Sequence, residues 1–442
     1  MGLGFAVRTD TVDIRSASYI IAASDSAHQG ADKGVATGAD AALAIVAGIN
    51  ALGANGGKIK LLAGTYEIKS TVAIPNNIIL EGETAGNMNA RYTNPGTLTL
   101  GTVLQISGSA GFSIVGAKTT QRDYVHSIGL RHLQIEYVGT QPPGSRTVPI
   151  RLDYAADCWL HGVVFKDFDT AVELTRAWDV NMTECAFSEC GFGEKAAVSL
   201  RHGSVFTERQ CAGLRFVDCT WQGRPGFSVL ASPNPAPGFP DSHADVNFLA
   251  CKFESGGSGR YPAIVGFFQG ATISSCWFYD VQELHGLPSE GNAFIHLRDS
   301  SNCVVSGNRF AEFDQYAIAI EDGWYNLVSG NHIDPQTTPF QPDAACVRLR
   351  NTGYNPTIYP QPVNYGFHSL IGNVYKGTIP SVSETPGWIE RASGLGMDTD
   401  RVLDLRAEEL DPGAQSPVAS GKYLPVKIDG ALKYIRLYHY PL

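Results

Sequence analysis

Residues 163–187 read VVFKDFDTAVELTRAWDVNMTECAF and contain one short pattern twice. Val163-Val164-Phe165 begins the stretch, and Cys185-Ala186-Phe187 ends it 22 residues later. Between them, Ala171-Val172-Glu173-Leu174 follows the two-residue period of a strand with one buried face. The stretch therefore predicts a repeating unit of short strands separated by turns.

The same unit recurs along most of the chain. Counted from Val163, the first positions of successive copies lie 22, 34, 32, 25, 32, 23 and 42 residues apart. The short intervals match one coil, and the longer ones match a coil plus a loop. Further copies of the first pattern are Leu133-Gln134-Ile135, Cys219-Thr220-Trp221, Cys251-Lys252-Phe253, Cys276-Trp277-Phe278, Asn308-Arg309-Phe310, Asn331-His332-Ile333 and Asn373-Val374-Tyr375. Further copies of the alternating strand lie at 150–153, 197–200, 294–297, 317–320 and 346–349.

Strands this short, with no amphipathic helices between them, do not fit a fold of alternating strands and helices. They fit coils that stack along one axis, with parallel strands about 4.8 Å apart. The predicted fold class is all-β, a single-stranded right-handed parallel β-helix. Such a solenoid accommodates 442 residues because it grows along its axis.

The repeat also explains most of the cysteines. Four of them begin a copy of the pattern, at the position that asparagine occupies in the last three copies. Stacked amides can hydrogen-bond along such a row, and buried thiols behave as small apolar groups. We predict an internal ladder. Nine cysteines with no CxxC pair favour neither a disulfide framework nor a cysteine-ligated metal. The row consists of Cys185, Cys219, Cys251, Cys276, Asn308, Asn331 and Asn373.

A helix is predicted near residues 39–52, because apolar residues recur on one of its faces and Thr37 or Asp40 can cap it. The predicted face contains Leu43, Val46, Ile49 and Leu52. Such a helix would cover the open end of the first coil, which otherwise exposes apolar side chains and strand edges.

The segments after this helix read GGKIKLLAGTYEI at 56–68 and VAIPNNIILEG at 72–82. The order of capping helix, GG, strand, GTY, strand and LEGE resembles the opening of pectate-lyase-like right-handed parallel β-helix proteins. That superfamily includes polysaccharide lyases, glycoside hydrolases, uronan epimerases and phage tailspike depolymerases. The resemblance spans about residues 20–380 and implies a polysaccharide partner. Trimers are common among such tailspikes, so a homotrimer is also implied.

Three regions are expected. Residues 1–20 form an N-terminal extension, 21–395 form the β-helix, and 396–442 form a linker followed by a hairpin with an Asp429-Gly430 turn. This tail resembles the C-terminal ends of phage β-helix proteins, and a simple cap on the last coil explains it equally well.

The charge argues against some partners. The net charge is −10 and no lysine and arginine cluster is present, so nucleic acid is not expected. A local basic stripe would still suit an acidic sugar polymer. No apolar segment is long enough to span a membrane, and the start does not resemble a signal peptide. We therefore expect an extracellular or virion-associated protein without a classical signal peptide.

A charged stripe follows the alternating strands. We align the strands on the last inward residue of each. The two residues that follow this position then form two columns along the stack. The candidate catalytic residues are Asp299, Glu321 and Asp322, because glycosidases use two carboxyl groups. These groups lie about 5–5.5 Å apart for retention of configuration and about 6.5–9.5 Å apart for inversion. Neighbours in one column can meet the first spacing, and the diagonal pair Asp299 and Glu321 the second. The aligned residues are Leu152, Leu174, Leu200, Leu297, Ile320 and Leu349, followed by Asp153-Tyr154, Thr175-Arg176, Arg201-His202, Arg298-Asp299, Glu321-Asp322 and Arg350-Asn351.

The same stripe also suits β-elimination, in which arginines neutralise a sugar carboxylate and His202 removes a proton. Exposed aromatic rings stack on sugars, which adds Trp324 and Tyr325. Ordinary surface pairing of these charges and a structural His202 are the competing interpretations. The candidate substrate-binding residues are Arg176, Arg201, His202, Arg298, Arg350, Trp324 and Tyr325.

No cofactor or metal is expected. An acidic row at Asp167, Glu189, Asp280 and Glu312 can hold Ca²⁺ or form solvated turns, and it contains no DxDxDG loop. The Asn-Thr-Asp, Asp-Asp and Gly-His-Gly motifs of polygalacturonases are absent, as is the Arg-x-Pro-x-x-Arg pattern of pectate lyases. Three classes of function stay open: a polysaccharide hydrolase or lyase, a non-catalytic carbohydrate-binding virion or surface protein, and a structural β-helix.

Overall fold

The computed structural model describes residues 18–26, 31–85, 101–116, 124–203, 210–223, 226–233, 242–254, 261–281, 293–313, 315–335, 345–350 and 368–375. It also describes the backbone of four short strand segments at 382–384, 391–393, 418–428 and 431–439. For residues 280, 281 and 350 the backbone alone is described.

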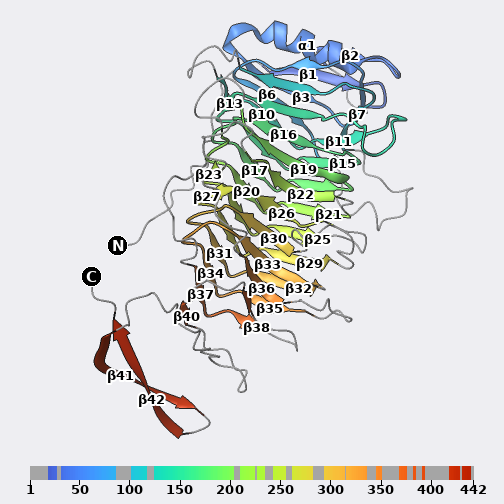
Figure 1. The fold of residues 1–442 in the computed structure, drawn as a ribbon. Coiled ribbons are helices and arrows are strands. Elements are labelled where there is room, and N and C mark those ends of the chain that lie inside the picture. The colour runs from blue at the N-terminus through green and yellow to red at the C-terminus, as the bar shows by residue number, and fades with distance from the viewer. Residues whose placement is uncertain are drawn as a thin grey trace. The chain divides into compact units, whose positions relative to one another are not determined.

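Three long parallel sheets, here called A, B and C, form the body, and the chain visits them in turn in each coil (Figure 1). Sheet A contains β2 (Lys33–Val35), β1 (Ser18–Ala23), β3 (Gly57–Leu61), β6 (Ile78–Gly82), β10 (Gly129–Arg131), β14 (Trp159–His161), β17 (Asn181–Thr183), β20 (Arg215–Val217), β24 (Asn247–Leu249), β28 (Thr272–Ser274), β31 (Val304–Ser306), β34 (Leu327–Ser329), β37 (Ser369–Ile371) and β40 (Arg391–Ser393).

Sheets B and C have eleven strands each. Sheet B contains β4 (Gly64–Ile68), β7 (Thr102–Ile106), β11 (Gln134–Tyr137), β15 (Val164–Lys166), β18 (Ala186–Ser188), β21 (Thr220–Gln222), β25 (Lys252–Glu254), β29 (Trp277–Val281), β32 (Arg309–Phe313), β35 (His332–Asp334) and β38 (Val374–Tyr375). Sheet C contains β5 (Val72–Ala73), β8 (Phe112–Val115), β12 (Ile150–Asp153), β16 (Val172–Thr175), β19 (Gly193–Arg201), β22 (Gly226–Ala231), β26 (Ile264–Gly266), β30 (Ala293–Arg298), β33 (Tyr316–Glu321), β36 (Ala345–Arg350) and β39 (Val382–Glu384). Two short parallel pairs, β9 (Val125–His126) with β13 (Ala155–Ala156) and β23 (His243–Ala244) with β27 (Phe268–Gln269), lie at the corner between sheets C and A.

The predicted fold class is confirmed, since the strands stack in parallel with neighbours one coil apart. A left-handed backbone conformation ends each sheet A strand from β10 to β37 at the corner leading to sheet B, and it turns the chain sharply. Glu184, Asp218 and Ser275 have φ of 54°, 52° and 58° there, and glycine takes the same place at Gly307 and Gly330.

The predicted ladder follows this corner and is confirmed. Asn331 Oδ1 accepts the backbone N–H of Asn308 at 3.0 Å, and Asn331 Nδ2 donates to the Val305 carbonyl at 2.9 Å. In the coils that have cysteine at this position, the thiol makes the equivalent of the second bond. The Cys185 thiol donates to the Leu160 carbonyl at 3.4 Å. All nine cysteines are buried and free. The row therefore ties each coil to the preceding strand of sheet A.

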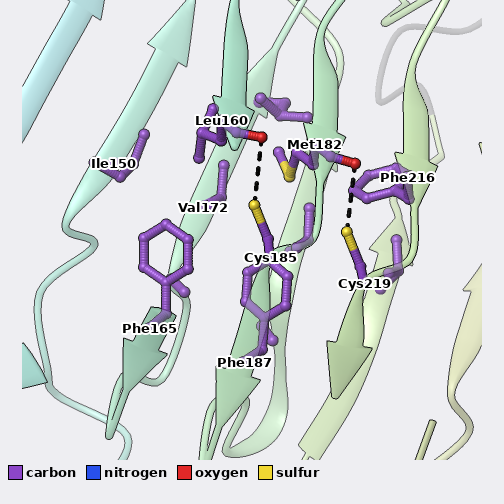
Figure 2. Close-up of a cluster of buried hydrophobic side chains, with 14 of the residues drawn as sticks. Ile150, Leu160, Phe165, Val172, Met182, Cys185, Phe187, Phe216 and Cys219 are labelled. Carbon is purple, nitrogen blue, oxygen red and sulfur yellow. Dashed lines mark hydrogen bonds between the residues drawn. The ribbon is translucent and has the colours of Figure 1, made fainter. Parts of the chain in front are cut away.

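Aromatic rings fill the space beneath sheet B. Adjacent rings are nearly parallel, with centroids 4.5–5.2 Å apart. This offset stacking follows from coil spacing, which brings equivalent inward residues together. Figure 2 shows its start, with Phe165 and Phe187 side by side beneath the Cys185 and Cys219 thiols. The stack consists of Phe165, Phe187, Trp221, Phe253, Phe278 and Phe310.

Helix α1 (Ala41–Leu52) caps the first coil, and a short 3₁₀ turn, η1 (Gly53–Asn55), follows it. Asp40 is the N-cap, and its carboxylate also accepts the Lys69 N–H and the Ser70 hydroxyl, which fastens the helix to the coil.

The predicted buried face of this helix is partly wrong. Leu43 is 68% exposed and Val46 is also exposed, whereas Ile49 is buried. Small residues form the buried side, because they let the helix lie close to the coil. A Cβ added at Gly48 would lie 2.9 Å from the Tyr19 ring. The buried residues are Ala41, Ala42, Ala44, Ile45, Gly48 and Ile49.

The predicted C-terminal hairpin is also present. Strand β41 (Val418–Ile428) pairs with β42 (Ala431–His439) in antiparallel fashion, with Ile428 opposite Ala431. The chain divides into two compact units, Met1–Gly396 and Met397–Leu442. The described residues contain no helix long and apolar enough to cross a membrane.

Replacing Asn331 should destabilise the coil stack. In Asn331→Ala the buried N–H of Asn308 loses its acceptor, which costs about 1–3 kcal/mol. The urea midpoint of unfolding measures this loss, and Asn247→Ala on the outer face of sheet A is the control. Equal midpoints for the two variants would contradict the role assigned to the ladder.

The buried histidines should make the protein sensitive to acid. His243 Nδ1 accepts the Cys211 N–H at 3.1 Å, and its Nε2–H donates to the Ser232 carbonyl, so the ring is neutral. Burial lowers the pKa of His243 to about 3 and that of His368 to about 4. The unfolded chain binds these protons near pH 6.5, so stability is complete above that pH and falls as the pH drops toward 3.

His243→Asn keeps an acceptor and removes the titration. We expect its melting temperature to fall less than that of the wild type between about pH 6.5 and 4. His126→Asn, which makes the same substitution at a more exposed ring, is the control. An unaltered slope in His243→Asn would show that this ring does not control acid stability.

Candidate active site

The predicted alignment of the stripe is confirmed at every position used to define it. Paired Cα atoms run through Leu152, Leu174, Leu200, Ala231, Gly266, Leu297, Ile320 and Leu349. The two coils whose register the sequence did not define contribute Ala231 and Gly266 to this row.

The stripe is divided into two halves that do not meet. Three coil steps separate Leu200 from Leu297, which places Arg201 and Arg298 about 14 Å apart along the axis. Ser232 and Phe267 follow the intervening strands and carry no charge. The charged stripe therefore consists of two separate surfaces.

The N-terminal half is occupied with internal contacts. Arg176 is only 1% exposed, and its Nε donates to the Tyr124 hydroxyl at 2.6 Å. Arg201 pairs with Glu173 at 3.0 Å. The His202 ring lies 4.3 Å from that of His243. Arg176, predicted to contact substrate, is thus an interior residue, because the corner turns its side chain toward aromatic rings.

The C-terminal half gathers the three candidate carboxyl groups. Arg298, Glu321 and Arg350 are Cα partners on successive coils, and the Asp299 N–H donates to the Glu321 carbonyl at 2.9 Å. Asp299 and Asp322 have φ of 41° and 59°, so both occupy the left-handed corner that ends a sheet C strand. Aspartate tolerates this conformation better than most residues, which explains its recurrence there.

Glu321 is held by two charged or polar partners. Its carboxylate lies 3.0 Å from His296 Nε2 and 3.7 Å from Arg298 Nε, and the residue is 8% exposed. Burial lowers the pKa of His296, although Glu321 opposes that shift. His296 is then a neutral donor at neutral pH, and Arg298 balances the charge of the Glu321 carboxylate.

Sequence reasoning missed His296, Arg348 and Tyr316. All three lie on the outer face of sheet C, and the Arg348 guanidinium stands 4.9 Å from the Tyr316 ring centroid. Tyr316 packs in a small apolar cluster with Ala293, Ala319 and Ala345, separate from the core. Alternation was the usable signal for His296 and Arg348, since each precedes an inward leucine, Leu297 or Leu349, and therefore faces outward. Alternation with the inward Ile318 and Ile320 does not predict the position of Tyr316.

The two candidate aromatic residues follow the carboxyl groups directly. Tyr325 is 58% exposed, and Trp324 is partly buried. Gly323 is required between them and Asp322, because an added Cβ would overlap the Ser300 carbonyl. The corner therefore presents a carboxyl group and an exposed ring within four residues of sequence.

The acidic row is divided between turns and strands: Asp167 and Glu189 lie in turns, whereas Glu312 lies within β32. Asp167, Glu189 and Glu312 all have positive φ, and Asp169 accepts the N–H groups of Gly144 and Arg146. The side chain of Asp280 lies outside the described residues. No group of three or more His, Cys, Asp or Glu suited to a metal ion occurs among the residues that the structure describes.

Comparisons with solved structures find the same architecture in viral and bacterial surface proteins. ORF18 of Geobacillus virus E2 matches 72% of this chain and 60% of its own length, with 16% identity and a TM-score of 0.52. A mutant tailspike protein of Escherichia coli bacteriophage HK620, in complex with a pentasaccharide, matches 81% of this chain and 62% of its own, with 13% identity and a TM-score of 0.52.

The surface adhesin PfbA of Streptococcus pneumoniae matches 90% of this chain and 96% of its own, with 13% identity and a TM-score of 0.50. The chain thus spans about three fifths of the length of the two phage proteins. No protein-family model matches the sequence, and no curated protein sequence matches it. At this level of identity the likeness shows the fold alone, which is a right-handed parallel β-helix.

Proposed function

We propose that this protein binds a long polysaccharide along the outer face of sheet C and cleaves it as a glycoside hydrolase. The observation that carries the proposal is the buried Glu321 carboxylate, which pairs with His296 and Arg298 beside Asp322. A carboxylate removed from water and fixed by defined partners is typical of catalytic acids and bases.

Roles follow from the partners of each group. The Glu321 carboxylate is fixed by contacts with Arg298 and the neutral His296, which suits a base or a nucleophile. Asp299 and Asp322, on the adjoining corner, supply the acid that protonates the leaving oxygen. Tyr325 offers an exposed ring on which a sugar can stack.

Hydrolysis is favoured over β-elimination because the residues that elimination would use are engaged in internal contacts. Arg176 is 1% exposed, Arg201 forms an ion pair with Glu173, and the His202 ring lies against that of His243. Asp299, Glu321 and Asp322 lie together in the other half of the stripe. An elimination site would need a base and arginines that can contact one sugar residue.

The setting belongs to the same proposal. The fold is shared with a phage tailspike whose structure contains a pentasaccharide and with a bacterial surface adhesin. We place this protein outside the cell or on a virion, as a tailspike-type depolymerase, and propose assembly as a homotrimer.

Glu321→Gln should abolish most cleavage while keeping binding. On a panel of neutral and uronic polymers, the wild type should release reducing ends without the ultraviolet absorbance of an unsaturated uronic acid. The variant should lose about 10²–10⁴-fold in rate, the size typical of a lost proton-transfer group. Glu173→Gln is the matched control, since Glu173 is an ion-paired carboxylate on the same sheet in the other half.

An absorbance rise would redirect the assignment to a lyase. Binding without any cleavage by the wild type would favour a non-catalytic carbohydrate-binding protein. Full activity in Glu321→Gln would remove this residue from the mechanism, and the same assay on Asp299→Asn and Asp322→Asn would then locate the chemistry.

A further inference from the structure

A second surface, on the outer face of sheet B, gathers aromatic and basic side chains that the proposed cleavage does not use. Lys252, Trp277 and Arg309 are Cα partners on three successive coils. Glu254 and Tyr279 are partners in the next outward column. These five residues are called the Trp277 cluster. Figure 1 shows β25, β29 and β32, which carry them, as successive strands of one sheet.

The indole is the centre of the cluster. The Lys252 ammonium lies 4.9 Å from the Trp277 ring centroid, and the Arg309 guanidinium lies 6.0 Å from it. The Tyr279 ring centroid is 5.6 Å away. Despite these contacts, Trp277 is 38% exposed. Nearly every other tryptophan or phenylalanine at a strand position of this sheet faces inward. The indole thus holds two cations at the surface through cation–π contact.

The charges of the cluster are not balanced. Lys252 forms an ion pair with Glu254 at 2.7 Å. Arg309 is exposed and forms no ion pair with any residue in the described part of the chain. Its partner on the next coil, His332, is also exposed. Lys252 and Arg309 thus place two cations beside one exposed indole, with Glu254 and, three coils further on, Asp334 in the adjoining outward column.

The cluster belongs to the same coils as the candidate active site but to another sheet. Strand β29 precedes β30, which carries His296 and Arg298, and β32 precedes β33, which carries Glu321. A polymer bound at one face can therefore be held at the same level of the solenoid by the other. Two contacts on one polymer raise its effective concentration at each site.

We infer that the Trp277 cluster is a binding site for anionic saccharides, with Arg309 and Lys252 pairing with carboxylate or sulfate groups and the aromatic rings contacting the sugar. Guanidinium groups bind such oxyanions with charge-assisted hydrogen bonds, and aromatic rings contact the apolar faces of sugars. This site is independent of the proposed cleavage, because it shares no residue with it.

The test measures binding to three probes by isothermal titration calorimetry. Dextran sulfate and dextran share a backbone and differ in charge, and polygalacturonate presents carboxylates instead of sulfates. Arg309→Gln and Trp277→Ala should each weaken binding of an anionic probe about tenfold, and neutral dextran should not bind at the cluster.

Two control variants make the test specific. Trp178→Ala removes a tryptophan that is 37% exposed at another corner, and Arg215→Gln removes an exposed arginine on sheet A. Both should bind as the wild type does. The cleavage proposal is tested by the release of reducing ends and this one by the affinity for the anionic probes, so failure of the two proposals is distinguishable.

Loss of affinity for polygalacturonate alone assigns the cluster to sugar carboxylates, and loss for dextran sulfate alone assigns it to sulfate esters. Either result supports the inference. It is overturned if the wild type binds neither anionic probe, or if the control variants lose as much affinity as the cluster variants. It is also overturned if Trp277→Ala changes the sedimentation coefficient and leaves affinity unchanged, because the cluster would then be a contact between copies of the chain.

Discussion

The corner between sheets A and B is the constraint on which the structure depends. One residue adopts a left-handed conformation there, and the next points inward to donate to the strand of the preceding coil. If that buried row did not keep its hydrogen bonds, successive coils would be free to shift in register. A shift of one residue would move every inward side chain to the surface. The thiols and amides of the ladder therefore fix the positions of all three sheets.

Because the register is fixed, equivalent residues of successive coils form columns on the outer faces of the sheets. Residues that recur in successive coils lie about 4.8 Å apart, which suits a ligand that is itself a repeating polymer. The outer face of sheet C uses this geometry to bring Arg298 beside Glu321 and to place Asp299 beside Asp322. The outer face of sheet B uses it to hold Lys252 and Arg309 on either side of Trp277. The same pairing of residues one coil apart thus produces two chemically different surfaces.

Sequence reasoning was effective wherever register alone decides position. It predicted the ladder from Cys185 to Asn373 and the pairing of Ile320 with Leu297, because both follow from repeat spacing. It was wrong where close packing decides, as for Leu43, which is exposed because small residues bring the capping helix against the coil. It also could not foresee the burial of Arg176 or the contact of His296 with Glu321, since both depend on side-chain directions across neighbouring coils. The pairing of these strand-end charges with Arg298 was one interpretation of the sequence, whereas the contact with His296 was not considered.

The most direct test of the account is a crystal structure of the Glu321→Gln variant with a bound oligosaccharide of the polymer that the wild type cleaves. We predict a saccharide chain on the outer face of sheet C, with one glycosidic oxygen within hydrogen-bonding distance of the Asp299 or Asp322 carboxyl group. A saccharide bound only on another face, with no sugar near residue 321, would contradict the assignment of this face as the active site.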